Sequence, residues 1–168
     1  MTSIIDLAKY DGLGLAELVR TKEVTAAELL EAVLARADTT NPIINAIVTR
    51  FDDAARAAIN AGLPSGPFTG VPYLLKDLGA YYTGALTSFG STFFTESADH
   101  DSEITARYKR AGLVIFGKTS TCELGLSVTR QPGNAAALAQ AGDQARWQAQ
   151  RERPPDMLQL AQVICANR

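Results

Sequence analysis

The sequence of 168 residues is poor in the residue types that build metal centres and disulfide frameworks. It contains one histidine, His100, and two cysteines, Cys122 and Cys165, too few for a histidine-rich metal site or a secreted disulfide framework. No apolar run approaches the ~20 residues of a membrane helix, and the first residues lack the pattern of a secretory signal. We therefore expect a cytoplasmic protein with no metal, no cofactor and no membrane partner.

Charge of either sign is not in large excess. The formal net charge of −2 argues against a protein whose main partner is a nucleic acid. Apolar residues make up 46% of the chain and charged residues 20%, which is typical of globular proteins. The length is enough to bury a core, and it suggests one domain or part of a larger one.

The first 60 residues are rich in helix signals. Asp11 is placed to cap a short helix, and Thr25 and Glu28 have the spacing of a capping box. We expect the helix that this box opens to stop at Asn41 and Pro42, because proline lacks an N–H group and restricts the residue before it. A short strand over residues 43–48 and a helix over 51–61, ended by Gly62, are predicted next.

Two apolar segments further along the chain favour an α/β fold. Residues 71–75 and 113–116 read as buried strands, and residues 102–111 between them read as a helix. A strand, a helix and a second strand in this order imply a parallel pair buried on both faces. The predicted fold class is therefore α/β, with N-terminal helices and part of a mixed or parallel sheet.

The composition changes near residue 130. Glutamine is absent from residues 1–130 but occurs seven times in residues 131–168, and serine is absent after Ser127. We interpret residues 1–130 as the N-terminal part of a domain. Residues 131–168 are interpreted as an unrelated tail rich in Gln, Ala and Arg, poorly ordered or weakly helical.

One motif imitates a nucleotide-binding site. Residues 112–119 satisfy the phosphate-loop pattern GxxxxGK[ST]. In a true phosphate loop the intervening residues form a turn whose N–H groups face the nucleotide, whereas here they are the predicted strand, and sheet pairing uses their N–H groups. A strand followed by a tight turn is the better interpretation.

Lys76 is the candidate for chemistry, because α/β enzymes place their functional groups at strand ends. Partial burial there would lower the pKa of a lysine amine and let the neutral form act as a base. Asp77 would oppose this effect if the two side chains met. By position alone, a solvated surface lysine is the commoner alternative.

Several segments resemble the amidase signature family. Residues 70–78, GVPYLLKDL, resemble its GVPxxxKD block, and HDSEITARYKRAGLVIFGKTSTCELG resembles a later block. Together with the N-terminal helices, the resemblance covers about residues 4–129. It implies amide-bond hydrolysis with a serine, a second serine on a cis peptide, and a lysine, which would be Lys76. It also assigns Lys118 to a structural turn.

The resemblance ends before the two serines of the family, which lie in a downstream Gly/Ser-rich stretch. This chain has no such stretch, and Ser88 and Ser91 do not match those positions. His100 is interpreted as a surface or capping residue, and Cys122 as structural because no basic neighbour is evident to activate it.

These observations lead to two hypotheses. The first is an amidase-type hydrolase of small-molecule amides that is truncated or frameshifted near residue 130 and inactive alone, because its base has no serine to deprotonate. The alternative is a non-catalytic interaction or fragment protein. In either case strands 71–75 and 113–116 lose neighbours, and we expect self-association through exposed edges.

Overall fold

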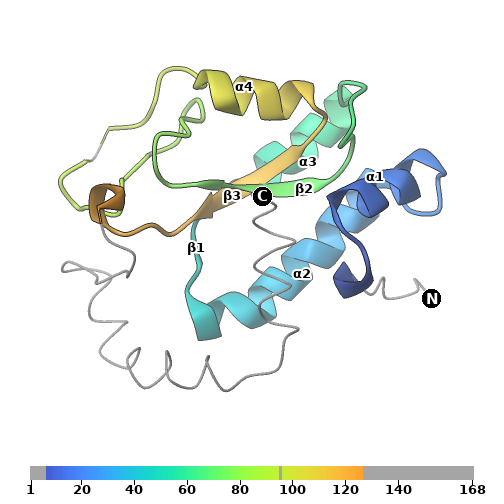
Figure 1. The fold of residues 1–168 in the computed structure, drawn as a ribbon, viewed down its shortest axis with the longest axis horizontal. Coiled ribbons are helices and arrows are strands. Elements are labelled where there is room, and N and C mark those ends of the chain that lie inside the picture. The colour runs from blue at the N-terminus through green and yellow to red at the C-terminus, as the bar shows by residue number, and fades with distance from the viewer. Residues whose placement is uncertain (1–6, 95, 127–168) are drawn as a thin grey trace.

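The computed structural model describes residues 7–94 and 96–126 (Figure 1). Helices and strands alternate through this part of the chain. In order, they are the 3-10 helix η1 (Leu7–Lys9), α1 (Gly12–Arg20), α2 (Ala26–Ile44), β1 (Ile47–Arg50), α3 (Asp52–Ala61), β2 (Pro72–Lys76), α4 (Glu103–Arg110), β3 (Val114–Thr119) and the 3-10 helix η2 (Glu123–Gly125).

The three strands form one mixed sheet in the order β1-β3-β2. β3, the last strand along the described residues, is therefore the central one. It pairs antiparallel with β1 and parallel with β2, and α4 lies in the crossover between β2 and β3. This arrangement confirms the prediction of an α/β fold with a partly parallel sheet.

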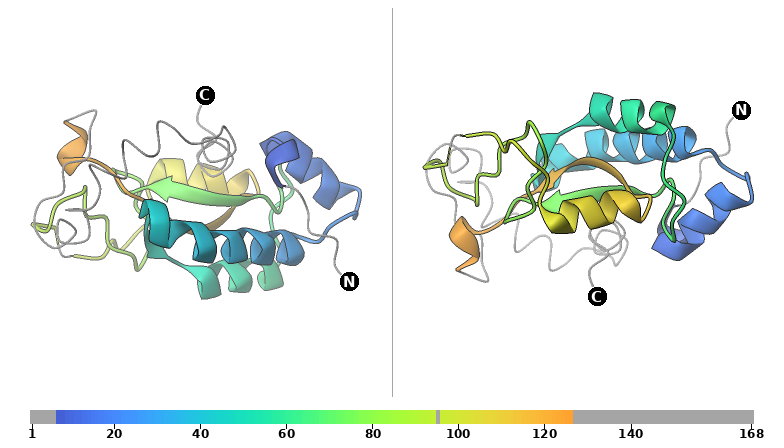
Figure 2. Two further views of the ribbon diagram at one scale, coloured as in Figure 1. Left: turned by 90° about the horizontal axis from the view of Figure 1, so that it is seen from below. Right: turned by 90° about the horizontal axis from the view of Figure 1, so that it is seen from above.

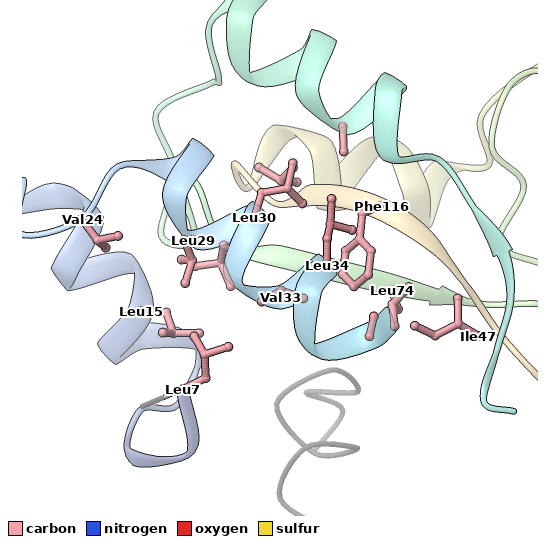
Figure 3. Packing of buried hydrophobic residues seen from close by; sticks show 14 residues of the cluster. Leu7, Leu15, Val24, Leu29, Leu30, Val33, Leu34, Ile47, Leu74 and Phe116 are labelled. Atoms are coloured by element: carbon pink, nitrogen blue, oxygen red, sulfur yellow. The ribbon is translucent and has the colours of Figure 1, made fainter. Parts of the chain in front are cut away.

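Helices cover both faces of the sheet, with α2 and α3 on one side and α4 on the other (Figure 2). The larger core lies on the α2 side, where Leu30 and Leu34 join Leu74 and Phe116 of the sheet (Figure 3). The smaller core contains Tyr73, Leu75, Ala80 and Ile115, with Tyr108 of α4 packed against it. Alternating side chains of β2 and β3 thus enter opposite cores, as the pleat of a strand requires.

The predicted caps of the first two helices are confirmed. The Asp11 carboxylate accepts from the backbone N–H of Gly14 at 2.7 Å. Thr25 and Glu28 form the complete capping box, in which each side chain binds the other's backbone N–H group. These bonds satisfy donors that a helix start leaves without partners.

The predicted end of α2 at Asn41 and Pro42 was wrong. The helix continues through Pro42 to Ile44, and Asn45 ends it in the left-handed conformation with φ of +47°. Pro42 lacks only the hydrogen bond that its own N–H group would make. The Asn41 carbonyl still accepts a hydrogen bond from the Asn45 backbone N–H at 2.7 Å. The Asn41 side chain then binds the backbone of Ile47 through both its oxygen and its nitrogen, so the strand begins later than residue 43.

Two strands run further than the apolar pattern indicated. β2 includes Lys76, and β3 includes Gly117, Lys118 and Thr119. The assignment of Lys118 to a turn was therefore wrong, because the backbone pairing of β3 with both neighbours continues past its apolar residues. The tail predicted for residues 131–168 and Cys165 lie outside the described residues. No helix in residues 7–94 and 96–126 is both long and apolar enough to cross a bilayer.

Gly117 is a position where the sheet leaves no room for a side chain. An added Cβ would collide with the Thr49 carbonyl oxygen of β1 and lie 3.1 Å from the Leu74 side chain. We expect Gly117→Ala to lower the free energy of unfolding by about 1–3 kcal/mol, the usual cost of overpacking. Urea unfolding followed by circular dichroism measures the change.

Gly12 provides the matched control for Gly117. A methyl group at Gly12 would lie 3.6 Å from the Phe68 ring, an ordinary contact. Alanine is also preferred over glycine within helices by about 1 kcal/mol, so Gly12→Ala should be neutral or stabilising. Equal effects of the two substitutions would contradict the close strand approach at Gly117.

Candidate functional site

The predicted site residue, Lys76, is the last residue of β2 and lies opposite Thr119 in the sheet. Its side chain is exposed, although the four preceding residues of β2 are buried. The partial burial expected for Lys76 is therefore not observed. The sheet presents this amine at the carboxyl end of a parallel strand pair, the end at which α/β enzymes place their functional groups.

Asp77 follows Lys76 and is 2% exposed. Its carboxylate accepts from the Ser88 backbone N–H, at 3.2 Å to each oxygen, and from the Ser88 hydroxyl at 2.5 Å. The Asp77 backbone N–H donates to the Thr119 carbonyl at 3.0 Å. These bonds hold the carboxylate against the loop that follows β2.

Lys118 is the buried cation of this region, with a side-chain exposure of 0%. Its amine donates to the Leu86 carbonyl at 2.8 Å and to the Thr87 hydroxyl, and lies 3.7 Å from an Asp77 carboxylate oxygen. Desolvation lowers the pKa of the Lys118 amine, and the Asp77 charge partly counters this effect. The amine therefore connects β3 to β2 and to the loop around Leu86.

A β-bulge explains why Lys118 and Asp77 meet. Tyr73 pairs with Ile115, but the next residue, Leu74, pairs with Gly117, so β3 carries one extra residue. The shift puts Lys118 opposite Leu75. The sequence did contain a signal for Lys118. A single lysine that continues an apolar strand either lies at the exposed end of the strand or is buried with a partner for its charge.

The other candidate residues have local partners. His100 is exposed, and its ring nitrogen lies 2.5 Å from the Asp99 carboxylate, in agreement with its interpretation as a surface residue. Ser91 donates to Glu123 at 2.7 Å, and Cys122 is half-buried. Within residues 7–94 and 96–126, no group of three His, Cys, Asp or Glu side chains is placed to hold a metal ion.

The phosphate-loop pattern does not form a phosphate loop. All residues from Val114 to Thr119 lie in β3, and the Lys118 amine is directed to Leu86, Thr87 and Asp77. The strand in our interpretation of this segment is confirmed, but the tight turn is not, because residues 117–119 belong to β3. Because the lysine of the pattern is fully buried, it is not available to a nucleotide.

A mixed sheet with a lysine at the end of its parallel pair defines an α/β protein with a candidate functional site, and comparison with known proteins gives the family. The family model described as Amidase matches residues 28–135. The chain therefore belongs to the amidase family.

Individual relatives support this assignment. The chain is 43% identical over 125 residues to the 6-aminohexanoate-cyclic-dimer hydrolase of Paenarthrobacter ureafaciens, a match that covers 73% of this chain and 25% of that protein. It is 38% identical over 122 residues to a lipoamidase of Enterococcus faecalis, covering 71% of this chain and 17% of that protein. The chain thus spans about a quarter, or less, of the length of these relatives.

A solved structure of 6-aminohexanoate cyclic dimer hydrolase with substrate superposes on the chain with a TM-score of 0.69. The two are 41% identical, and the match covers 76% of this chain and 27% of the other. The described residues therefore have the fold of the corresponding segment of an amidase signature enzyme.

The buried Lys118–Asp77 pair should contribute strongly to stability. Lys118→Met would leave the Asp77 carboxylate buried without its cation, and removing one partner of a buried pair costs about 3–5 kcal/mol. The matched control is Lys109→Met, because Lys109 forms a half-exposed pair with Asp101 at 2.5 Å. Such pairs are worth about 1 kcal/mol or less. Comparable losses in urea unfolding would contradict the difference in burial.

The stability of the chain should also depend on the titration of Lys118. Burial lowers the pKa of Lys118 in the folded chain below the ordinary value of 10.5, which applies to the unfolded chain. At pH values between the folded-state pKa and 10.5, the unfolded chain therefore binds more protons than the folded one. Linkage then makes the free energy of unfolding rise with pH. We expect the unmodified chain to gain stability relative to D77N/K118M as pH rises toward 10.5. Urea unfolding across the alkaline range checks this, and a constant difference would contradict it.

Proposed function

We propose that the chain is the N-terminal part of an amide hydrolase in which Lys76 acts as the general base. The observation that carries this proposal is the position of Lys76, with an exposed amine at the carboxyl end of β2, inside a segment that matches the amidase family. Small-molecule amides are the corresponding substrate class.

The proposed chemistry follows from the properties of a neutral lysine amine. It takes a proton from a bridging serine, which in turn takes the proton of a nucleophilic serine as that oxygen attacks the amide carbonyl. Backbone N–H groups stabilise the negative oxygen of the tetrahedral intermediate. The proton then passes to the leaving amine, and water releases the acyl group from the nucleophile.

The 168 residues do not supply the two serines of this scheme. The sequence has no Gly-Gly-Ser-Ser-Gly-Gly segment and no serine after Ser127. The hydroxyl groups of Ser88 and Ser91 donate hydrogen bonds to Asp77 and Glu123, respectively. Neither hydroxyl is therefore presented to Lys76. We therefore propose that these residues hydrolyse amides only when further sequence supplies the serines.

A cyclic amide is the first substrate to test, because two similar proteins are named as hydrolases of the 6-aminohexanoate cyclic dimer. We would join residues 1–126 to the part of the Paenarthrobacter enzyme that follows its matched segment. The chimera should hydrolyse the cyclic dimer, and Lys76→Ala should reduce kcat by about 10²–10⁴-fold, the usual contribution of a general base. Release of the linear dimer, measured by chromatography, gives the rate.

Lys22→Asn is the control for this experiment. Lys22 is exposed with φ of +62°, and asparagine tolerates this left-handed conformation, so its activity should stay unchanged. Full activity of the Lys76→Ala chimera would refute the role of Lys76. A folded but inactive chimera would instead favour the interaction alternative, for which Phe93 and Leu126 provide apolar surface at 83% and 84% exposure.

A further inference from the structure

The burial of Lys118 has a geometric relation to Lys76. Lys76 is the last residue of β2, and Asp77 begins the turn that follows it. Lys118 pairs with Leu75 in the sheet and approaches Asp77 to 3.7 Å. The buried cation and the Asp77 carboxylate therefore lie together in the interior, whereas the Lys76 side chain is exposed.

This arrangement gives Asp77 a full set of partners away from Lys76. Its carboxylate accepts two donors from Ser88, and Lys118 supplies the balancing positive charge. Lys118 is itself held by Leu86 and Thr87. A carboxylate in this environment gains little by turning toward another cation, because it would leave charge-assisted bonds that are shielded from water.

We propose that Lys118 is a positioning residue for Lys76: by binding the buried Asp77 carboxylate, it prevents that carboxylate from pairing with the Lys76 amine. A lysine paired with a carboxylate holds its proton more tightly and is a poorer base and nucleophile. The importance of this role for catalysis rests on the proposed function of Lys76. The interaction itself belongs to the residues of this chain.

Several other carboxylates in the part of the chain that the structure describes have partners of their own. Asp101 binds Lys109 at 2.5 Å, Glu123 accepts from Ser91 at 2.7 Å, and Asp99 lies 2.5 Å from His100. Glu96 is exposed. Asp77 is the carboxylate next to Lys76 in the chain. Its release from Lys118 is therefore the change that would most affect the Lys76 amine.

The test measures the reactivity of Lys76 in the full 168-residue protein. Trace acetic anhydride at mildly alkaline pH acetylates each lysine at a rate that reports its free amine, and mass spectrometry resolves the sites, with Lys22 as the internal reference. In Lys118→Met, acetylation of Lys76 should slow about two- to fivefold, the range that an exposed ion pair supports. In D77N/K118M the rate should return to that of the unmodified chain, because the competing carboxylate is gone.

Lys109→Met is the matched control, since it removes a cation that is paired with Asp101 on the same side of the sheet; the Lys76 rate should not change. If Lys118→Met does not fold by circular dichroism, Lys118→Gln replaces it, because glutamine keeps a hydrogen-bond donor without the charge. An unchanged or faster Lys76 rate in the folded variant would overturn the proposal. So would a slow rate that persists in D77N/K118M.

Failure of this proposal is distinguishable from failure of the proposed function. The acetylation rates depend only on the electrostatics around Lys76 and require no turnover. The Lys76→Ala chimera tests catalysis and requires no contribution from Lys118. Lys118 is thus refuted as a positioning residue by labelling, and Lys76 is refuted as a base by kinetics.

Discussion

Pairing of β3 on both of its edges is the constraint on which the rest of the structure depends. Val114 to Thr119 bind β1 on one side and β2 on the other, and their side chains enter both cores. Because β1 comes so close, Gly117 has no room for a side chain. The bulge beside it sets the direction of every later residue, which is why Lys118 enters the sheet face and not the solvent.

Burial of the charged Lys118 amine costs free energy, and its surroundings show how this cost is offset. Removing an ammonium group from water is unfavourable unless hydrogen bonds and an opposite charge replace the lost hydration. Leu86, Thr87 and Asp77 supply these replacements. As a result the loop after β2 is fixed to the strand ends by polar bonds.

Local sequence signals predicted helix starts well, because a cap depends on residues only three positions apart. The bonds of Asp11 and the Thr25–Glu28 box needed no knowledge of tertiary contacts. The end of α2 was missed because Asn41 binds Ile47 of the following strand, a contact that outweighs the usual effect of Pro42. The family resemblance and the parallel strand pair were likewise predictable, since both depend on patterns within short contiguous segments of the sequence.

The site was predictable only in part. The segment around Lys76 singled out that residue, but its exposure depends on which neighbours cover the strand end. Lys118 was missed because its role depends on the register between β2 and β3, and a single bulge changes that register. No pattern within one strand encodes the partner of a side chain on another strand, so a buried ion pair such as Lys118–Asp77 is visible only once the sheet is assembled.

The two lysines lie near the same end of the parallel strand pair but differ in their surroundings, because Lys118 of β3 is buried and Lys76 of β2 is exposed. In the proposed function, a general base at Lys76 requires groups that cover it and no carboxylate that binds it. The second condition is met within the described residues, because Asp77 is bound to Lys118 and Ser88. The first is not met there, since Lys76 is exposed. If Lys76 is the base of the proposed function, the groups that cover it have to come from the same further sequence that supplies the serines, and formation of the base is then coupled to assembly of the nucleophile.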